Sequence, residues 1–425
     1  MNIIKGELIS EKIYLNDKRA KNINFIYHKK NCIKIKDKLK NYYHFCDNII
    51  SENIFSENKK KRNPGIDLIR LMASFLIILT HSIFFGNIFG KYPQYTKQIL
   101  SLHFLTDWHN NSFALISGII GYKKCRYSNL IYLWLTVHFY SVAIHIYVQK
   151  WKKKLNFIGD EISKDCFPII YQRYWYCTAY FAMYLFLPVI NKGISCLTKS
   201  ELKFVVLSIL TIFILWRDFK NSSYDVFNTN SGYSMLWLLI LYLTGAYIGK
   251  YSPIYDGLKK YIFCMICVFI FSFLSYAFIK VNHKDLQLGK NYFHTELLLF
   301  LKNIFNKRFD SLLKTVQAII VCFFFLQIHY NKYFDKIICF FGPLAFGVYL
   351  IHFHPLIVRN IIMHMFDGEK KDRSLNSVIN LLLLKAFKIF VFCLIVEYIR
   401  NKIFSALNLR KLCILIERKI SPRFN

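Results

Sequence analysis

The chain has 425 residues, of which 55% are hydrophobic and 18% aromatic, and its formal net charge is +32. The apolar residues gather in long blocks and most basic residues lie between them, which is typical of a protein that crosses a membrane several times. Because Lys and Arg gather in the cytoplasmic loops of such proteins, topology accounts for much of the charge and disfavours a nucleic-acid-binding role.

Residues 1–63 are rich in Lys, Asn and Ile and contain no continuous apolar core of the kind found in a signal peptide. A run of four basic residues, 59–62, directly precedes the first apolar block, so the positive-inside rule places the N-terminus in the cytoplasm. We therefore predict a basic, polar cytoplasmic tail over 1–63, which is either disordered or forms a short surface helix around 23–27.

The first apolar block, Gly65 to Phe85, contains Arg70 and His81. At about 100° per residue, their separation closes about three helical turns, so both side chains face one side, roughly 16 Å apart along the axis. Asp67 is three residues before Arg70 and can pair with it on this face. A charge at mid-membrane costs roughly 2.5 to 3.5 kcal/mol, so such residues usually face a protein interior or a water-filled path. The alternative is an Arg that snorkels to the interface and a His satisfied by a neighbouring helix.

A hydropathy window of about 19 residues predicts about ten membrane-spanning helices. They lie at 66–86, 101–122, 129–149, 173–190, 203–217, 233–250, 260–280, 311–330, 337–358 and 379–399. The second is interrupted by polar residues at 107–111, so it is either shorter or lines a functional site. In the sixth, Gly245 and Gly249 form a G-x-x-x-G, which is typical of close helix packing.

The expected fold is therefore an all-α integral membrane protein with both termini in the cytoplasm. The membrane domain covers 64–400, and a basic cytoplasmic tail covers 401–425. The basic residues of 150–154 would face outward against the rule, unless that segment lies at the interface or the count of spans is off by one there. Cys264 and Cys267 form a C-x-x-C without a second ligand pair, so we interpret them as packing residues and expect no metal site.

The ninth span carries a second polar pair, Tyr349 and His352, again three residues apart. The pair either faces the interior of the bundle or is hydrogen-bonded near the outer interface, where aromatic residues gather.

Four motifs, in this order, resemble those of the membrane acyltransferase-3 family. They are Gly65-Ile66-Asp67-Leu68-Ile69-Arg70 with His81 closing an R-x10-H, then Ser112-Phe113-Ala114-Leu115-Ile116-Ser117-Gly118, then Tyr174-Trp175-Tyr176 with Leu187-Pro188, and Phe346-Gly347-Val348-Tyr349-Leu350-Ile351-His352. The resemblance spans about Pro64 to Arg400. It implies a ten-helix membrane enzyme that moves an acyl group, usually acetyl, from cytoplasmic acyl-CoA to a hydroxyl, commonly on a surface polysaccharide or other glycan.

The resemblance also implies roles for individual residues. Arg70 and His81 are the residues needed for transfer, with His81 as general base on the acceptor hydroxyl or as the carrier of the acyl group. On spacing alone, and not from the resemblance, Arg70, Tyr349 and Ser117 are the candidate oxyanion donors. The residues expected to contact substrate are Asp67, Ser117, Trp175, Tyr349 and His352.

The basic turn after the second helix is expected to hold the phosphates of acyl-CoA through Lys123, Lys124 and Arg126. Paired arginines often occupy this turn in the family. Here a Lys replaces one of these arginines. A lysine can contact a phosphate as a point charge but cannot form the bidentate contact of an arginine. Ala345 also stands where the family has Ser before the Phe-Gly of the ninth helix.

We thus predict an O-acetyltransferase of the plasma or inner membrane that uses acetyl-CoA, requires no metal, and contacts membrane lipid and a glycan acceptor. The alternative is a secondary transporter or flippase of a polar or glycan substrate, because intramembrane Arg, His and Asp also mark substrate and proton pathways. The R-x10-H has no second copy in the later half of the chain, whereas transporters often contain internal repeats. This difference favours the enzyme.

Overall fold

The computed structural model describes residues 62–123, 125–151, 160–215, 225–251, 258–282, 308–327 and 331–420. The chain divides into two units, Met1–Arg62 and Asn63–Asn425, and the elements below belong to the second. Within the described ranges the secondary structure is helical, with turns and no strand. The predicted all-α class is confirmed.

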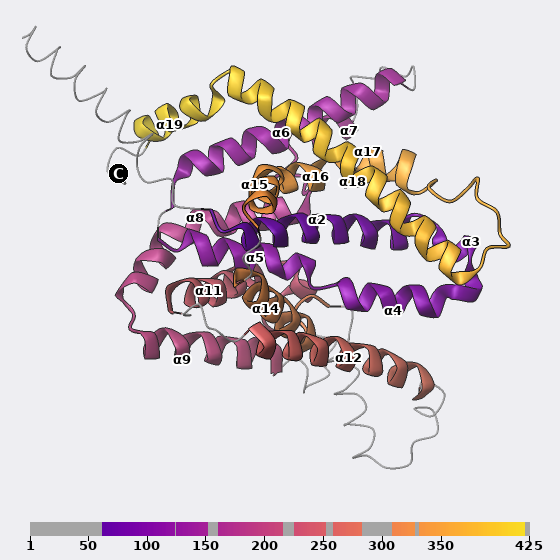
Figure 1. Ribbon diagram of the computed structural model, residues 1–425. Helices are drawn as coiled ribbons and strands as arrows, with labels where there is room; N and C mark the ends of the chain where they lie inside the picture. Colours follow the sequence, from indigo (N-terminus) through magenta and orange to yellow (C-terminus); the bar gives the residue numbers. More distant parts are fainter. Residues whose placement is uncertain are drawn as a thin grey trace, which may run out of the picture. The chain divides into compact units, whose positions relative to one another are not determined.

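Helices of very different length follow one another along the chain (Figure 1). In order they are α2 (Pro64–Phe85), α3 (Ile88–Lys91), η1 (Pro93–Tyr95), α4 (Thr96–Thr106), α5 (His109–Gly121), α6 (Tyr127–Trp151), α7 (Asp160–Cys166), α8 (Trp175–Cys196), α9 (Lys199–Leu210), η2 (Thr211–Leu215), η3 (Asn230–Gly232), α11 (Met235–Tyr251), α12 (Leu258–Asn282), α14 (Leu312–Leu326), α15 (Lys332–Phe341), η5 (Gly342–Leu344), α16 (Ala345–His352), α17 (Pro355–Ile357), η6 (Val358–Ile362), α18 (Leu375–Ala406) and α19 (Leu409–Ile420).

Among the described residues, five helices are long and apolar enough to cross a membrane: α2, α6, α8, the continuous segment Lys332–His352 formed by α15, η5 and α16, and α18. Two further apolar helices, α11 and α14, are shorter. The chain is therefore a membrane protein with several spans. The predicted total of about ten spans and the cytoplasmic location of the termini stay predictions.

The second predicted span, 101–122, is wrong as one continuous helix. The chain forms α4 up to Thr106, turns at Asp107 and Trp108, and resumes as α5 at His109. The turn falls where five polar or amphipathic residues follow one another, and Asp107 and Trp108 are both buried inside the protein. The alternative stated for this span, that it is shorter, is confirmed.

A helix continues across the predicted domain boundary at residue 400, and the division into a membrane domain and a cytoplasmic tail stays a prediction. The helix α18 runs through residue 400 to Ala406, and α19 follows after a short turn, so much of 401–425 is helical. Cys413 of α19 is buried against α6, while Leu412 and Leu415 are exposed. An amphipathic helix thus occupies a segment that was expected to be only a charged tail.

Local sequence explains where α2 begins and ends. Asn63 caps it, because its side-chain oxygen accepts the amides of Gly65 and Ile66, and Pro64 takes the first helical position. At the other end the amide of Gly86 donates to the carbonyl of Ser82.

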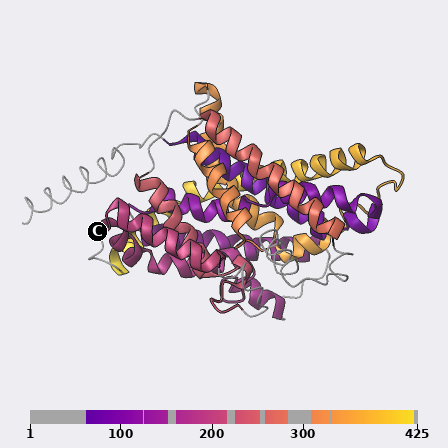
Figure 2. The same cartoon turned by 90° about the horizontal axis from the view of Figure 1, so that it is seen from below.

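The helix α2 is enclosed by other helices, since it packs against α5, α14, α15, α16 and α18. Figure 2 shows the neighbouring layer, in which α12 lies along α14. Because α2 has helices on several sides, a polar stripe on it can be directed into protein instead of lipid.

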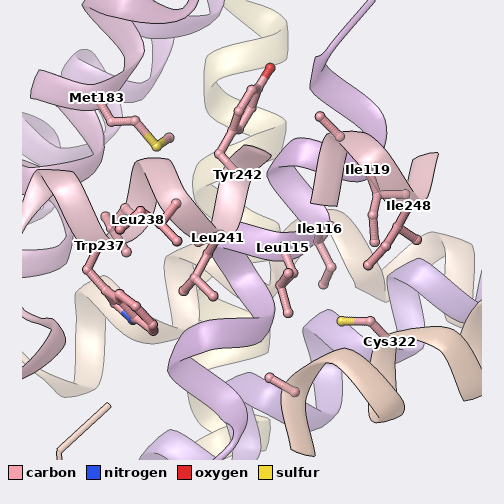
Figure 3. Packing of buried hydrophobic residues seen from close by; sticks show 14 of the residues in the cluster. Leu115, Ile116, Ile119, Met183, Trp237, Leu238, Leu241, Tyr242, Ile248 and Cys322 are labelled. Atoms are coloured by element: carbon pink, nitrogen blue, oxygen red, sulfur yellow. The ribbon is translucent and has the colours of Figure 1, made fainter. Parts of the chain in front are cut away.

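The helices α5 and α11 pack closely along their length, and glycine allows their close approach. A Cβ atom at Gly245 would lie 2.1 Å from the carbonyl oxygen of Leu115, and one at Gly118 would lie 2.0 Å from the carbonyl oxygen of Tyr242. The backbones therefore touch directly, as predicted from the G-x-x-x-G. Figure 3 shows the apolar core that this contact builds, with Leu115 and Ile116 of α5 beside Leu241 of α11.

We expect Gly245→Ala to destabilise the protein by about 1 to 3 kcal/mol, because the added methyl group collides with backbone that cannot rotate away. Thermal unfolding in detergent, measured by the melting temperature, checks this. Gly193→Ala is the matched control: nothing lies within 4 Å of a Cβ at Gly193, so alanine in this helix leaves the melting temperature unchanged or raises it. Equal melting temperatures for both variants would contradict the close-packing account.

Candidate active site

A cavity of about 460 Å³ lies at the end of the bundle where α2 reaches Phe85. Aromatic and aliphatic side chains from α2, α5, α8 and α16 form most of its wall. Of the residues singled out in the sequence, it brings together His81, Trp175 and Tyr349. The other residues of its wall with polar groups are Thr80, His103, Asp107, His109, Asn110, Tyr176 and Tyr233.

His81 forms a hydrogen bond with a second histidine. Its Nδ1 lies 3.0 Å from Nε2 of His352. The other ring nitrogen of His352, Nδ1, lies 2.6 Å from the carbonyl oxygen of Val348. A carbonyl oxygen only accepts, so Nδ1 of His352 carries a proton, and the neutral ring offers its Nε2 as an acceptor. His81 therefore donates from Nδ1, and its Nε2 holds a lone pair.

A break in the ninth span places His352. The helix α16 ends at this residue, and the chain turns through Phe353 before α17 begins at Pro355. His352 is completely buried and is not part of the cavity wall. The structure thus places it behind His81, and the expected contact between His352 and substrate has no support from its position.

Two aromatic rings hold the imidazole of His81. The ring of Phe353 stacks on it, with centroids 4.5 Å apart and planes inclined by 21°, and the ring of Phe85 lies at 5.4 Å. With Nδ1 bonded to His352, these contacts leave the ring little freedom to rotate. A fixed ring is what a base or a nucleophile needs.

The predicted pairing of Asp67 with Arg70 is confirmed. Nη1 of Arg70 donates to Oδ1 of Asp67 at 2.8 Å, and the side chain of Asp67 is only 2% exposed against 24% for Arg70. Gly342 makes room for this carboxylate, because a Cβ there would lie 2.4 Å from the Cβ of Asp67. The pair lies near the Pro64 end of α2 and is separate from the cavity.

Ser117 is also outside the cavity wall. Its hydroxyl donates to the carbonyl of Phe113 at 2.8 Å, within the same helix. Tyr180 of α8 is close enough to interact with both Ser117 and Arg70. Ser117 therefore belongs with Arg70 and not with His81. Of the three residues considered as oxyanion donors, Tyr349 is the one that lines the cavity with His81.

A second cavity, of about 510 Å³, lies at the Pro64 end of the bundle, and Lys123 lines it together with Lys192, Lys250 and Glu417. Lys250 donates to the last carbonyls of α8, including that of Ile194 at 2.6 Å. Lys123 and Lys192 are both exposed. The structure thus gathers basic groups from α8 and from the turn after α5 around one opening.

The other two residues of the predicted phosphate site are placed differently. Arg126 does not line this cavity, although its carbonyl accepts a hydrogen bond from the hydroxyl of Tyr184 at 3.0 Å. Lys124 lies outside the described residues.

Three tyrosines on α8 form a row between the two cavities. Tyr176 lines the aromatic cavity. Tyr180 follows one turn later, with its ring centroid 6.2 Å from that of Tyr176, and Tyr184 follows after another turn, with its ring centroid 6.0 Å from that of Tyr180. The spacing of four residues keeps them on one face of the helix. The row spans roughly 12 Å at about 1.5 Å per residue.

The structure adds a cluster around Asp107 that the sequence analysis did not assign. Asp107 forms a buried ion pair with Lys314 of α14, and Nε2 of His103 lies 3.5 Å from its Oδ2. Nε2 of His109 lies 3.8 Å from its Oδ1 and 3.1 Å from the hydroxyl of Thr80. Two signals were available: the polar interruption at 107–111, and a lysine inside the eighth apolar block.

We expect His81 and His352 to be neutral at neutral pH and both protonated on Nδ1, which is the less common tautomer of free histidine. The ¹⁵N spectrum of histidine-labelled protein checks this, since protonated and unprotonated ring nitrogens resonate far apart. In His352→Gln the two signals of His352 disappear and those of His81 shift. Protonation of His81 on Nε2 in the unaltered protein would contradict the assignment.

Comparison with known proteins agrees with this arrangement. A family model described as the acyltransferase domain, of the acyltransferase-3 type, matches residues 63–399. Searches of curated proteins and of solved structures returned no match. The matched range runs from the residue that caps α2 through most of α18 and includes the R-x10-H, the cavity and the break after His352. The chain therefore belongs to the membrane acyltransferase-3 family.

Proposed function

We propose that this protein transfers an acetyl group from cytoplasmic acetyl-CoA to a hydroxyl of a glycan on the other side of the membrane. Membership of the family supports acyl transfer in general. The observation that supports the finer proposal is the hydrogen-bonded series from His81 through His352 to the carbonyl of Val348, placed at the wall of an aromatic cavity.

His81 is the base in this proposal. The acceptor hydroxyl gives its proton to Nε2 of His81 while its oxygen attacks the thioester carbonyl carbon. The resulting imidazolium keeps its Nδ1–H bonded to His352, whose own Nδ1–H remains on the carbonyl of Val348. Both hydrogen bonds favour positive charge on His81. The neutral ring of His352 and the carbonyl of Val348 are uncharged acceptors whose negative ends point toward the imidazolium. His352 acts as a positioning residue.

The reaction balances without a further reactant. When the tetrahedral intermediate collapses, the bond from carbon to sulfur breaks, and the thiolate of CoA takes the proton back from His81. The products are the acetyl ester and CoA thiol. In the two-step version, Nε2 of His81 attacks the thioester first and the thiolate of CoA leaves. The acceptor oxygen then attacks the acetyl carbon, the bond from that carbon to Nε2 breaks, and the thiolate takes the proton of the acceptor hydroxyl. The buried hydroxyl of Tyr349 lines the cavity and has no hydrogen-bond partner among the described residues, so it is our preferred oxyanion donor.

The donor is proposed to enter from the Pro64 end, which the positive-inside rule makes cytoplasmic. Lys123 and Lys192, which line the second cavity, would hold its phosphates. Arg126 follows in the same basic turn, and the role expected for Lys124 stays a prediction. Its flexible arm would follow the row of tyrosines on α8 past Arg70 toward His81. Arg70, which Asp67 orients, is suited to a carbonyl of that arm, because its side chain is partly accessible.

We expect His81→Ala to abolish CoA release by purified protein in nanodiscs with acetyl-CoA and a panel of glycans, because both routes require its Nε2. The loss expected is about 10²-fold or more, the scale of a general base. His138→Ala is the matched control, since His138 is a half-buried histidine of α6 that stacks on Trp134, away from the cavity. Normal turnover by His81→Ala would refute the proposal. Glycan movement without CoA release would favour a transporter.

We expect the double variant Lys123→Ala with Lys192→Ala to raise KM for acetyl-CoA about tenfold with little change in kcat. Loss of one charge-assisted contact is worth about 1.5 to 3 kcal/mol in favourable cases, and about 1.4 kcal/mol corresponds to tenfold. Lys259→Ala, an exposed lysine of α12, controls for the loss of surface charge. A donor that lacks the 3′-phosphate should lose less affinity in the double variant than acetyl-CoA does. An unchanged KM for acetyl-CoA would contradict the proposal that Lys123 and Lys192 bind the nucleotide.

A further inference from the structure

The aromatic cavity has a second polar wall that the proposed chemistry does not use. Among the described residues, Oδ1 of Asp107 and Nδ1 of His109 are buried side-chain atoms without a hydrogen-bond partner, and both residues line this cavity. A buried polar atom without a partner costs about 1 to 3 kcal/mol. Atoms of this kind need an explanation, and two of them on the wall of one cavity indicate a ligand that completes their bonding.

The charges of this wall indicate what kind of ligand fits. Lys314 neutralises the carboxylate of Asp107 from the Oδ2 side, and both side chains are less than 5% exposed. The site therefore has no net charge to attract a cation or an anion. Oδ1 still accepts, and a ring nitrogen of histidine either donates or accepts according to its tautomer. An uncharged group with neighbouring hydroxyls supplies both complements.

Beside these polar groups the wall carries three contacting aromatic rings, and the ring of Phe309 lies 6.5 Å from that of His109. The rings of Trp175 and Tyr233 are 4.5 Å apart, and Phe309 lies 5.0 Å from Tyr233. Phe309 is held in place from behind, because its carbonyl accepts from the side-chain amide of Asn111 at 2.8 Å and Lys314 lies over its ring at 5.1 Å. Such a surface suits the flat, C–H-rich face of a sugar ring.

The second polar wall is next to the proposed base. His109 hydrogen-bonds the hydroxyl of Thr80, and Thr80 directly precedes His81 on α2. A ring bound by His109 and Asp107 would thus place one of its remaining hydroxyls toward His81. Which sugar hydroxyl faces His81 then depends on which of the other hydroxyls are bound by Asp107 and His109.

We propose that Asp107 and His109 bind adjacent hydroxyls of an uncharged pyranose whose face rests on Trp175, Tyr233 and Phe309, and that this contact selects the hydroxyl presented to His81. The inference rests on the proposed function, in that the bound sugar is the acetyl acceptor. It goes further in naming a neutral pyranose and the residues that recognise it.

The test is direct binding without acetyl-CoA, so that it does not depend on transfer. Saturation-transfer NMR on protein in nanodiscs measures binding of methyl glucoside, methyl galactoside and methyl mannoside, and of methyl glucuronide and methyl glucosaminide as charged probes. The unaltered protein is expected to bind at least one neutral glycoside, at least tenfold more tightly than either charged probe.

Two variants remove the contacts without leaving a charge unpaired. Asp107→Leu with Lys314→Met removes the ion pair as a unit together with the accepting oxygen, and Tyr233→Leu removes one ring and leaves the ion pair intact. Each is expected to weaken glycoside binding at least tenfold. The matched control is Glu369→Gln with Arg373→Met, a partly buried ion pair before α18 that does not line the cavity, and its binding should equal that of the unaltered protein.

The outcomes separate the two proposals. No binding of any neutral glycoside by the unaltered protein, or unchanged binding in both variants, overturns the inference even if acetyl-CoA is consumed. Glycoside binding that depends on Asp107 and Tyr233 supports it even if the CoA assay fails, in which case only the transfer chemistry is refuted. If the Asp107 variant does not fold, Tyr233→Leu decides alone.

Discussion

An apolar helix that carries Asp67, Arg70 and His81 must be enclosed by protein, and this constraint organises the molecule. In lipid these groups would lack partners. The bundle satisfies them by surrounding α2 with five other helices. Asp67 and Arg70 satisfy each other within the helix, whereas His81 depends on His352, which is 271 residues away in the sequence. The correct approach of α16 to α2 therefore decides whether His81 has a defined tautomer.

Glycines and a buried ion pair fix the position of α16. Gly342 accommodates the Cβ of Asp67 just before α16 begins, and Gly347 lies against the carboxyl end of Glu397, where a Cβ would be 2.2 Å from its Cδ. Glu397 is held in turn by Arg400 and by the hydroxyl of Tyr140 at 2.5 Å. The helix is thus confined between α2 and α18. Because the backbone at both glycines lies directly against a buried side chain, a small shift of α16 would displace His352 from His81.

The two ends of the bundle offer different chemistry. The Pro64 end gathers lysines around a cavity, which suits phosphates, whereas the Phe85 end has an aromatic cavity whose polar groups include His81, Asp107 and His109. The row of tyrosines on α8 lies between them. A donor with a charged head and a long neutral arm matches this order, and an acceptor with hydroxyls matches the far end. The proposed reaction therefore needs no substrate charge to enter the apolar middle of the bundle.

The sequence alone determined the helical class, the membrane setting, the pairing of Asp67 with Arg70 and the close packing at Gly245. Each follows from the period of one helix or from local composition, and helix geometry fixes which residues share a face. The sequence could not determine that His352 lies behind His81 instead of on the cavity wall, or that Asp107 pairs with Lys314. Both depend on which helices become neighbours and on where the ninth and second spans break. The spacing of residues along one helix does not show which other helices become its neighbours. The residues of each pair lie on different helices and are brought together only when the whole bundle packs.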